Sequence, residues 1–260
     1  MFLLPTGHGI PSQGTVSNPL AVTERADVLE SFLDHIDPNT ISPPLNPQIV
    51  VDVLEMAHKY NTPVIFSWFQ EVVKLRHYNQ VSNKTVESLL TLDPLRVLYI
   101  SLKYDLEAVG KWAMKELLGC SSHRLVFTEP GIPITTMGEI IIKRKERFER
   151  YKTYIQLLAS GQGSPQSMAH WRQRLNYFEV AASCLPCALS RIQWILWLNE
   201  EIQNSPQWST FRRCLHDVPE AQTPFCSKHQ NAWSFYSSGF TSSIEAEVKA
   251  LEEQEIRWPL

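Results

Sequence analysis

Two short pairs of residues could bind one metal ion between them. Cys184 and Cys187 form a C-x-x-C pair, and Cys226 and His229 form a C-x-x-H pair. Each spacing lets two side chains reach the same ion, so the four could supply the ligands of a zinc site. The pairs lie farther apart than those of an ordinary zinc finger, and Pro186 predicts that the helix breaks or kinks inside the first pair. We therefore favour structural cysteines around that kink, and we expect neither a bound metal nor another cofactor.

Segment 143–152 is rich in Lys and Arg and could contact phosphate groups or act as a nuclear signal. Glu146 and Glu149 interrupt the segment and can pair with its cations one helical turn away. This pattern favours a solvent-exposed helix face with internal ion pairs, and we do not expect nucleic-acid binding. One alternative function stays open, a zinc- or nucleic-acid-binding module that combines helix 143–152 with Cys184, Cys187, Cys226 and His229.

Aromatic and aliphatic side chains that could anchor a partner protein gather at Trp194, Ile195, Trp197 and Leu198, with Trp171 and Trp208 nearby. We favour the packed core of a helical region as their role. Patterns typical of enzymes are missing from the sequence, since the histidines lie apart and the carboxylates are spread singly. The sequence therefore predicts no catalytic residues and no enzyme.

Composition excludes further classes of protein. The net charge is −3, so there is no basic excess of the kind that marks nucleic-acid binders. Residues 1–5 lack the basic start of a signal peptide, and no apolar run is long enough for a membrane helix. We therefore expect a cytoplasmic or nuclear protein without membrane contact, whose cysteines are free thiols.

The sequence pattern of a helix pair occurs twice in the first half of the chain. Val53-Leu54, Lys59-Tyr60 and Trp68 recur as Val97-Leu98, Lys103-Tyr104 and Trp112, always 44 residues later. A helix pair buries its apolar face only against a neighbour, so repetition indicates a stacked helical scaffold.

Helix starts are marked by a capping residue before a proline, which loses an amide that has no partner in the first turn. The five such junctions are Asn46-Pro47, Thr62-Pro63, Asp93-Pro94, Ser164-Pro165 and Ser205-Pro206. They predict a mainly α fold with little sheet.

The chain divides by composition into four parts. Residues 1–20 form a loop, 15–119 a first helical region that begins within it, 120–140 a linker rich in Pro and Gly, and 141–260 a helical C-terminal region. Within the last part we expect an irregular stretch at 217–241 and then a Glu-rich helix.

The region 15–119 resembles the second half of a BTB/POZ domain and the helices that follow it, in the style of fungal BTB proteins. The motifs that carry the resemblance are Asp27-Val28-Leu29-Glu30 with Ile36-Asp37-Pro38, then Leu54-Glu55-Met56-Ala57-His58-Lys59-Tyr60, and then Pro94-Leu95-Arg96-Val97-Leu98. The first half of such a domain has no counterpart here, so the chain resembles an N-terminally truncated member.

The resemblance implies that this chain lacks interfaces formed by the first half of a BTB/POZ domain. In the family that half supplies most of the sheet and of the homodimer interface, so homodimerisation and binding to cullin-type ligases are in doubt for this chain. The apolar face of Val28, Phe32 and Ile36 would lose its packing partner. We expect a non-catalytic protein–protein interaction protein, a scaffold or adaptor whose partner the sequence does not identify.

Overall fold

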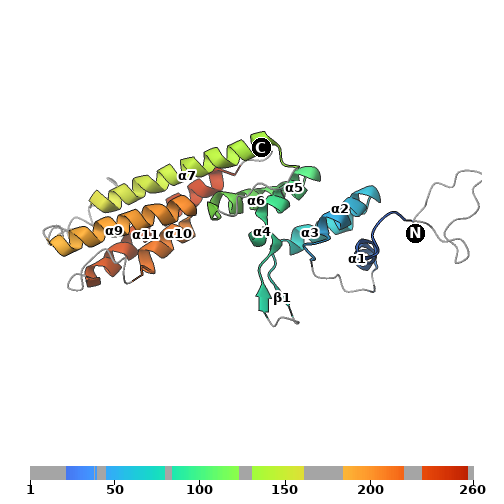
Figure 1. The fold of residues 1–260 in the computed structure, drawn as a ribbon, viewed down its shortest axis with the longest axis horizontal. Helices are drawn as coiled ribbons and strands as arrows, with labels where there is room; N and C mark the ends of the chain where they lie inside the picture. Colours follow the sequence, from blue (N-terminus) through green and yellow to red (C-terminus); the bar gives the residue numbers. More distant parts are fainter. Residues whose placement is uncertain are drawn as a thin grey trace, which may run out of the picture. The chain divides into compact units, whose positions relative to one another are not determined.

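The computed structural model describes residues 22–37, 39, 45–79, 84–122, 131–160, 184–219 and 230–256. Its contacts divide the chain into two compact units, 1–72 and 73–260, which are described separately here. The described residues form ten helices and one pair of short strands, which confirms the mainly α fold class with little sheet (Figure 1).

The first unit holds the helices α1 (Ala26–Ile36), α2 (Val50–Lys59) and α3 (Pro63–Val72). Helix α1 packs against both α2 and α3. Val28 and Phe32 of α1 are 3% exposed, and the Phe32 ring lies 5.9 Å from the Tyr60 ring. The expectation that this face would lack a packing partner is therefore wrong, because the α2–α3 pair covers it.

The second unit contains the antiparallel strands β1 (His77–Asn79) and β2 (Lys84–Val86), then α4 (Leu89–Leu92), α5 (Pro94–Lys103), α6 (Glu107–Gly119), α7 (Ile134–Ser160), α9 (Leu185–Asn204), α10 (Trp208–His216) and α11 (Gln230–Gln254). Helices α5 and α6 pack against each other, and α7 packs against α6 and α9. Helix α10 contacts both α9 and α11, and these helices form a bundle with α7 (Figure 1).

The repeated helix pair is confirmed. Helices α2 and α5 have the same length with starts 44 residues apart, and α3 and α6 also start 44 residues apart. The repeated pairs Val53-Leu54 and Val97-Leu98 are both buried at no more than 2% exposure. Equivalent sequence positions therefore build equivalent cores, while the stacking of the two pairs on each other stays a prediction.

The proline junctions mark helix starts with different capping groups. Asp93 behaves as predicted, since Pro94 begins α5 and the Asp93 Oδ1 accepts from the Arg96 amide at 3.1 Å. Pro63 also begins α3, but the Thr62 hydroxyl donates to a carbonyl of the preceding turn rather than accepting from the helix. At both of these junctions the proline is the first residue of the helix, but only at Asp93-Pro94 does the preceding side chain cap it.

Two other junctions depart from the prediction. The Asn46 side chain accepts from the Gln48 amide at 3.0 Å in a turn that precedes α2. The prediction of a cap at Ser205 is wrong, because its hydroxyl donates across to the Gly119 carbonyl at 2.6 Å and α10 begins only at Trp208. The Ser164-Pro165 junction lies outside the described residues.

Several boundaries also differ from those expected. Helix α7 already begins at Ile134, within the segment 120–140 that was predicted as a linker, and residues 123–130 of that segment lie outside the described residues. Helix α9 begins at Leu185 with Pro186 in its first turn, which agrees with the predicted break at this proline and not with a kink inside a longer helix, while residues 161–183 lie outside the described residues. Of the irregular stretch predicted at 217–241, residues 217–219 are irregular and 220–229 lie outside the described residues, but the prediction is wrong for 230–241, where α11 begins at Gln230 in a Ser-rich segment of weak helix propensity.

The core of the bundle contains the aromatic residues near the middle of α9, as favoured from the sequence. Trp194 is 1% exposed and its indole N–H donates to the Cys214 carbonyl of α10 at 3.4 Å. Trp171 lies outside the described residues. The other members of the core cluster are Tyr151, Ile155, Leu198, Ile202, Trp208, Phe211, Cys214, Leu215, Ile244 and Val248, with Ile195 and Trp197 packed against them.

Candidate functional site

The basic segment 143–152 lies on α7, and two of its cations are buried. Arg144 is 7% exposed and Arg147 is 2% exposed, so the expectation of a solvated face is wrong for both. Lys152 and Glu149 do form the predicted internal ion pair, at 3.3 Å. The buried guanidinium groups of Arg144 and Arg147 are therefore not available to the phosphate groups of a nucleic acid.

Arg144 joins the C-terminal ends of α6 and α9. One of its amino groups donates to the carbonyls of Leu117 and Cys120 at 2.8 and 2.7 Å, and the other donates to the Asn204 carbonyl at 3.1 Å. The last carbonyls of a helix lack internal donors and carry partial negative charge, which a cation stabilises. Burial lowers the pKa of Arg144, but a guanidinium stays charged at neutral pH. Arg144 thus has a structural role.

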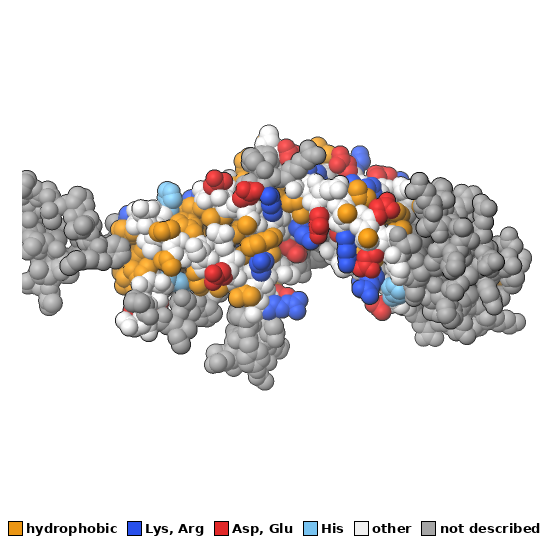
Figure 2. Space-filling view, turned by 180° about the vertical axis from the view of Figure 1, so that it is seen from behind, with side chains coloured by type: hydrophobic (Ala, Val, Ile, Leu, Met, Phe, Trp, Pro, Cys, Tyr) orange, Lys and Arg blue, Asp and Glu red, His pale blue; other side chains and the backbone are white. Residues whose placement is uncertain are grey.

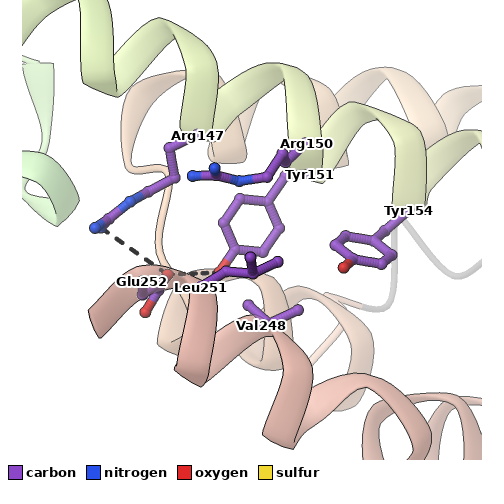
Figure 3. A pocket seen from close by; sticks show the side chains of 7 residues that line it. All are labelled: Arg147, Arg150, Tyr151, Tyr154, Val248, Leu251 and Glu252. Carbon is purple, nitrogen blue, oxygen red and sulfur yellow. Dashed lines mark hydrogen bonds and ion pairs between the residues drawn. The ribbon is translucent and has the colours of Figure 1, made fainter. Parts of the chain in front are cut away.

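Arg147 joins α7 to α11 through two carboxylates. Its Nε donates to Glu255 at 2.7 Å, and Glu252 lies 3.9 Å from the same guanidinium. A single oxygen of Glu252 also accepts from the Tyr151 hydroxyl at 2.7 Å and from the Trp208 amide at 2.9 Å. Figure 3 shows Arg147, Tyr151 and Glu252 converging between the two helices.

A small hollow lies beside this cluster and is lined by Arg147, Arg150, Tyr151, Tyr154, Val248, Leu251 and Glu252 (Figure 3). Its enclosed part has room for about one water molecule, which could reach the Nη2 of Arg147, a buried donor with no partner in the described protein. Arg150 pairs with Glu255, so the charges of the two helices balance. The arrangement fastens α11 to α7 and leaves no space for a substrate.

An open groove in the first unit carries charged side chains that already pair with one another. Lys59 forms a short ion pair with Glu24, which lowers the pKa of that carboxyl. Arg25 pairs with Asp27 and lies 3.6 Å from Asp52. Three carboxylates and two cations line the groove, so its charge is slightly acidic, and because the pairs are solvent-exposed they offer little with which to select a ligand.

The predicted metal ligands are only partly described. Cys187 lies on the buried face of α9, and Cys184 is half-buried just before the helix. Cys226 and His229 lie outside the described residues. Within the described ranges, no three His, Cys, Asp or Glu side chains gather as they would around a metal ion. The four-ligand zinc hypothesis is therefore not tested.

The outer face of α9 carries the most extended row of exposed apolar side chains on any described helix. Leu185 is 71% exposed, Leu189 and Ile192 are each 57% exposed, and Leu196 is 65% exposed. Their spacing places them on one side of the helix. We name these four residues the α9 stripe.

The α9 stripe was not predicted from the sequence, because only Trp194, Ile195, Trp197 and Leu198 of this helix were considered and they were assigned to the core. The buried residues Trp194 and Leu198 lie on the opposite side of the same helix. Apolar positions on both sides of α9 were the available signal, since a surface helix normally has only one apolar face.

Charged side chains on the described surface are mixed in sign. On the face drawn in Figure 2, Lys and Arg alternate with Asp and Glu along the bundle, and the described residues there form no single-sign patch. No described helix is long and apolar enough to cross a lipid bilayer. The mixed charge does not favour nucleic acid as the partner of the α9 stripe.

The class of protein is defined by the fold: a mainly helical chain with two equivalent helix pairs and a C-terminal bundle. Comparison with family models, curated proteins and solved structures found no match to this chain. The resemblance to BTB/POZ proteins therefore stays a prediction.

Proposed function

We propose that this chain is a non-catalytic protein–protein interaction module, a scaffold or adaptor, and that it docks a protein on the α9 stripe. The observation that carries this proposal is the exposure of four large aliphatic side chains along one side of one helix. Contiguous exposed apolar surface costs free energy in water, and in folded proteins it commonly marks a contact surface.

The α9 stripe is held on a rigid support. The opposite side of α9 is anchored by Trp194 and Leu198 in the core of the bundle, and Glu201 near its end pairs with Arg213 of α10 at 2.7 Å. A helix fixed in this way loses little conformational entropy when a partner binds, which favours affinity. Helix-in-groove recognition uses anchors at the same i, i+4, i+7 spacing.

The BTB-like interpretation is part of this proposal for the region 15–119. Its support is that α1, α2 and α5 occupy the segments in which the resembling motifs lie. Under this proposal the region presents a helical scaffold and the C-terminal bundle presents the α9 stripe. We place the adaptor in the cytoplasm or nucleus.

The proposal is tested by quantitative mass spectrometry of proteins captured by the full chain after cross-linking in its native cells. The double variant Leu189→Glu, Ile192→Glu introduces two charges into the α9 stripe. The matched control, Ile141→Glu, Ile142→Glu, makes the same kind of change on α7 at residues that are 51% and 58% exposed.

We expect a partner that the native chain and the α7 control capture alike and that the α9 variant loses. Circular dichroism establishes that each variant is folded. If the native chain and the folded α9 variant capture the same proteins in the same amounts, the α9 stripe is not the docking surface and the proposal is wrong.

A further inference from the structure

Helix α9 is apolar on two opposite sides, and only one of them is covered in the described structure. Trp194 and Leu198 lie in the core, whereas Leu189, Ile192 and Leu196 face outward. A helix that is apolar all round is normally buried all round. We propose that the α9 stripe is a homodimer interface, in which α9 pairs antiparallel with α9 of a second copy about a twofold axis; this inference rests on the proposed function.

The spacing of the α9 stripe is the same in both directions along the helix. The intervals between Leu185, Leu189, Ile192 and Leu196 are four, three and four residues. A twofold axis reverses the order of residues in the second copy. Leu185 of one copy therefore faces Leu196 of the other, and Leu189 faces Ile192, so that every large side chain meets another. A twofold interface needs this kind of self-complementary surface.

Charge also favours the antiparallel arrangement. Between Leu185 and Asn199 the only charged residue is Arg191, so the centre of the paired face is almost free of charge. Glu200 is exposed just after the α9 stripe. In an antiparallel pair it approaches the N-terminal end of the other α9, where the helix dipole is positive. A parallel pair would instead place the two Glu200 carboxylates side by side.

The size of the surface indicates a weak dimer. Helix α9 has 20 residues and is about 30 Å long, and the α9 stripe occupies little more than half of it. One helix pair of this length buries less than the roughly 1,200 Å² at which standard stable interfaces begin. We therefore expect a dissociation constant on the order of 1–100 μM, which corresponds to the transient class of association. This surface is separate from the dimer interface that the BTB resemblance implies.

Sedimentation velocity of the full chain between about 1 and 200 μM tests the association. We expect the mass to rise with concentration from the monomer value of 29.9 kDa towards twice that value. The variant Leu189→Glu, Ile192→Glu should stay monomeric across the range. The control Ile141→Glu, Ile142→Glu should dimerise like the native chain.

Cysteine cross-linking tests the direction of the pair. When a Leu185→Cys protein is mixed with a Leu196→Cys protein and oxidised, we expect a disulfide between the two introduced thiols, identified by peptide mass. Leu185→Cys alone should form no such bond, because the antiparallel arrangement separates the two copies of this residue by about 16 Å along the axis. The native chain, treated in parallel, controls for its own cysteines.

Three outcomes would overturn the inference. Efficient cross-linking of Leu185→Cys alone would show a parallel pair, and a dimer that survives in the folded α9 variant would lie elsewhere. A chain that is monomeric at every concentration would also overturn it. If that monomer still loses a captured protein in the α9 variant, the proposed function stands and the partner is a different protein.

Discussion

Asn61 and Asp105 hold the same left-handed backbone conformation, with φ angles of 51° and 52°. They are the only non-glycine residues with positive φ among the described residues, and they lie 44 positions apart. Each one follows the tyrosine that ends the first helix of a repeated pair. The repeat therefore extends from the apolar pattern to the conformation of a single backbone position.

The hydrogen bonds of the two turns are also equivalent. The Thr62 amide donates to the Ala57 carbonyl at 2.8 Å, and the Leu106 amide donates to the Ser101 carbonyl at 2.9 Å. A bond that spans six residues around a left-handed position is the Schellman motif, which usually has glycine at that position. Asn and Asp tolerate the conformation better than other side chains do. Each pair thus ends its first helix by the same local device.

Substitution of Asn61 or Asp105 tests the cost of this conformation. Glycine at either position should leave stability unchanged or raise it, because glycine adopts positive φ without steric strain. Alanine at either position should lower the free energy of unfolding by about 1 kcal/mol. Urea denaturation measures both effects, with Lys115→Ala on the exposed face of α6 as a control that should change little. Equal stability of the Gly and Ala variants would contradict the prediction.

Removal of the Arg144 side chain should destabilise the second unit strongly. The Arg144→Ala variant removes the charged donor shared by the final carbonyls of α6 and α9, and we expect a loss of about 3 kcal/mol in unfolding free energy. The Arg144→Lys variant should recover only part of this loss, because an ammonium cannot span both helix ends as the guanidinium does. Thermal unfolding compares both with Lys145→Ala, an exposed neighbour. A lysine variant as stable as the native chain would disprove the bridging role.

Glu252 should contribute more to stability than its sequence neighbour. It accepts from Tyr151 and from the Trp208 amide and lies near the buried Arg147. The Glu252→Ala variant should therefore lose about 2–3 kcal/mol, and Tyr151→Phe about 1.5–2 kcal/mol, the range for hydrogen bonds to charged groups. The exposed Glu253→Ala is the matched control in chemical denaturation. If both Glu variants unfold at the same denaturant concentration, the α7–α11 cluster has no stabilising role.

Stability should fall in alkaline solution. Burial and the nearby Glu247 raise the pKa of Tyr154 from 10.0 to about 12, and burial raises the pKa of Cys214 from 9.0 to about 12. The unfolded chain therefore releases these protons at lower pH than the folded chain does, so the stabilisation is complete below pH 9 and decreases as the pH rises towards 12.

The Tyr154→Phe variant isolates one of these contributions. Between pH 10 and 12 the midpoint temperature of its thermal unfolding should fall less than that of the native chain, because a titrating group with a raised pKa has been removed. Unfolding followed by circular dichroism at several pH values measures this difference. An equal fall of the midpoint temperature in both proteins would show that Tyr154 does not contribute to the loss of stability at alkaline pH.

Local patterns were sufficient to predict the helix pairs. The apolar positions of α2 and α5 recur at helical spacing, and Asp93 followed by Pro94 marks a start that the structure confirms. Helical hydrogen bonds join residues close in sequence, so such elements are visible in a short window. The cap predicted at Ser205 was wrong because its hydroxyl bonds to Gly119, which no local pattern relates to it.

The burial of cations on α7 could be decided only by tertiary structure. Arg144 bonds to Asn204, which lies 60 residues away, and Arg147 bonds to Glu255, which lies 108 residues away. In the sequence both arginines belong to an ordinary charged run with acidic neighbours. Whether a guanidinium is solvated or buried depends on what packs over it, and that neighbour comes from another part of the chain.

The amino-acid sequence by itself determined that α9 is a helix with apolar residues around it. Only the packing of α7 and α10 against one side decided that Trp194 is 1% exposed while Leu196, two residues on, is 65% exposed. The transfer of an apolar side chain out of water favours burial of either residue, whatever its position in the chain. Within the described residues the fold covers one side of α9 and leaves the other side exposed.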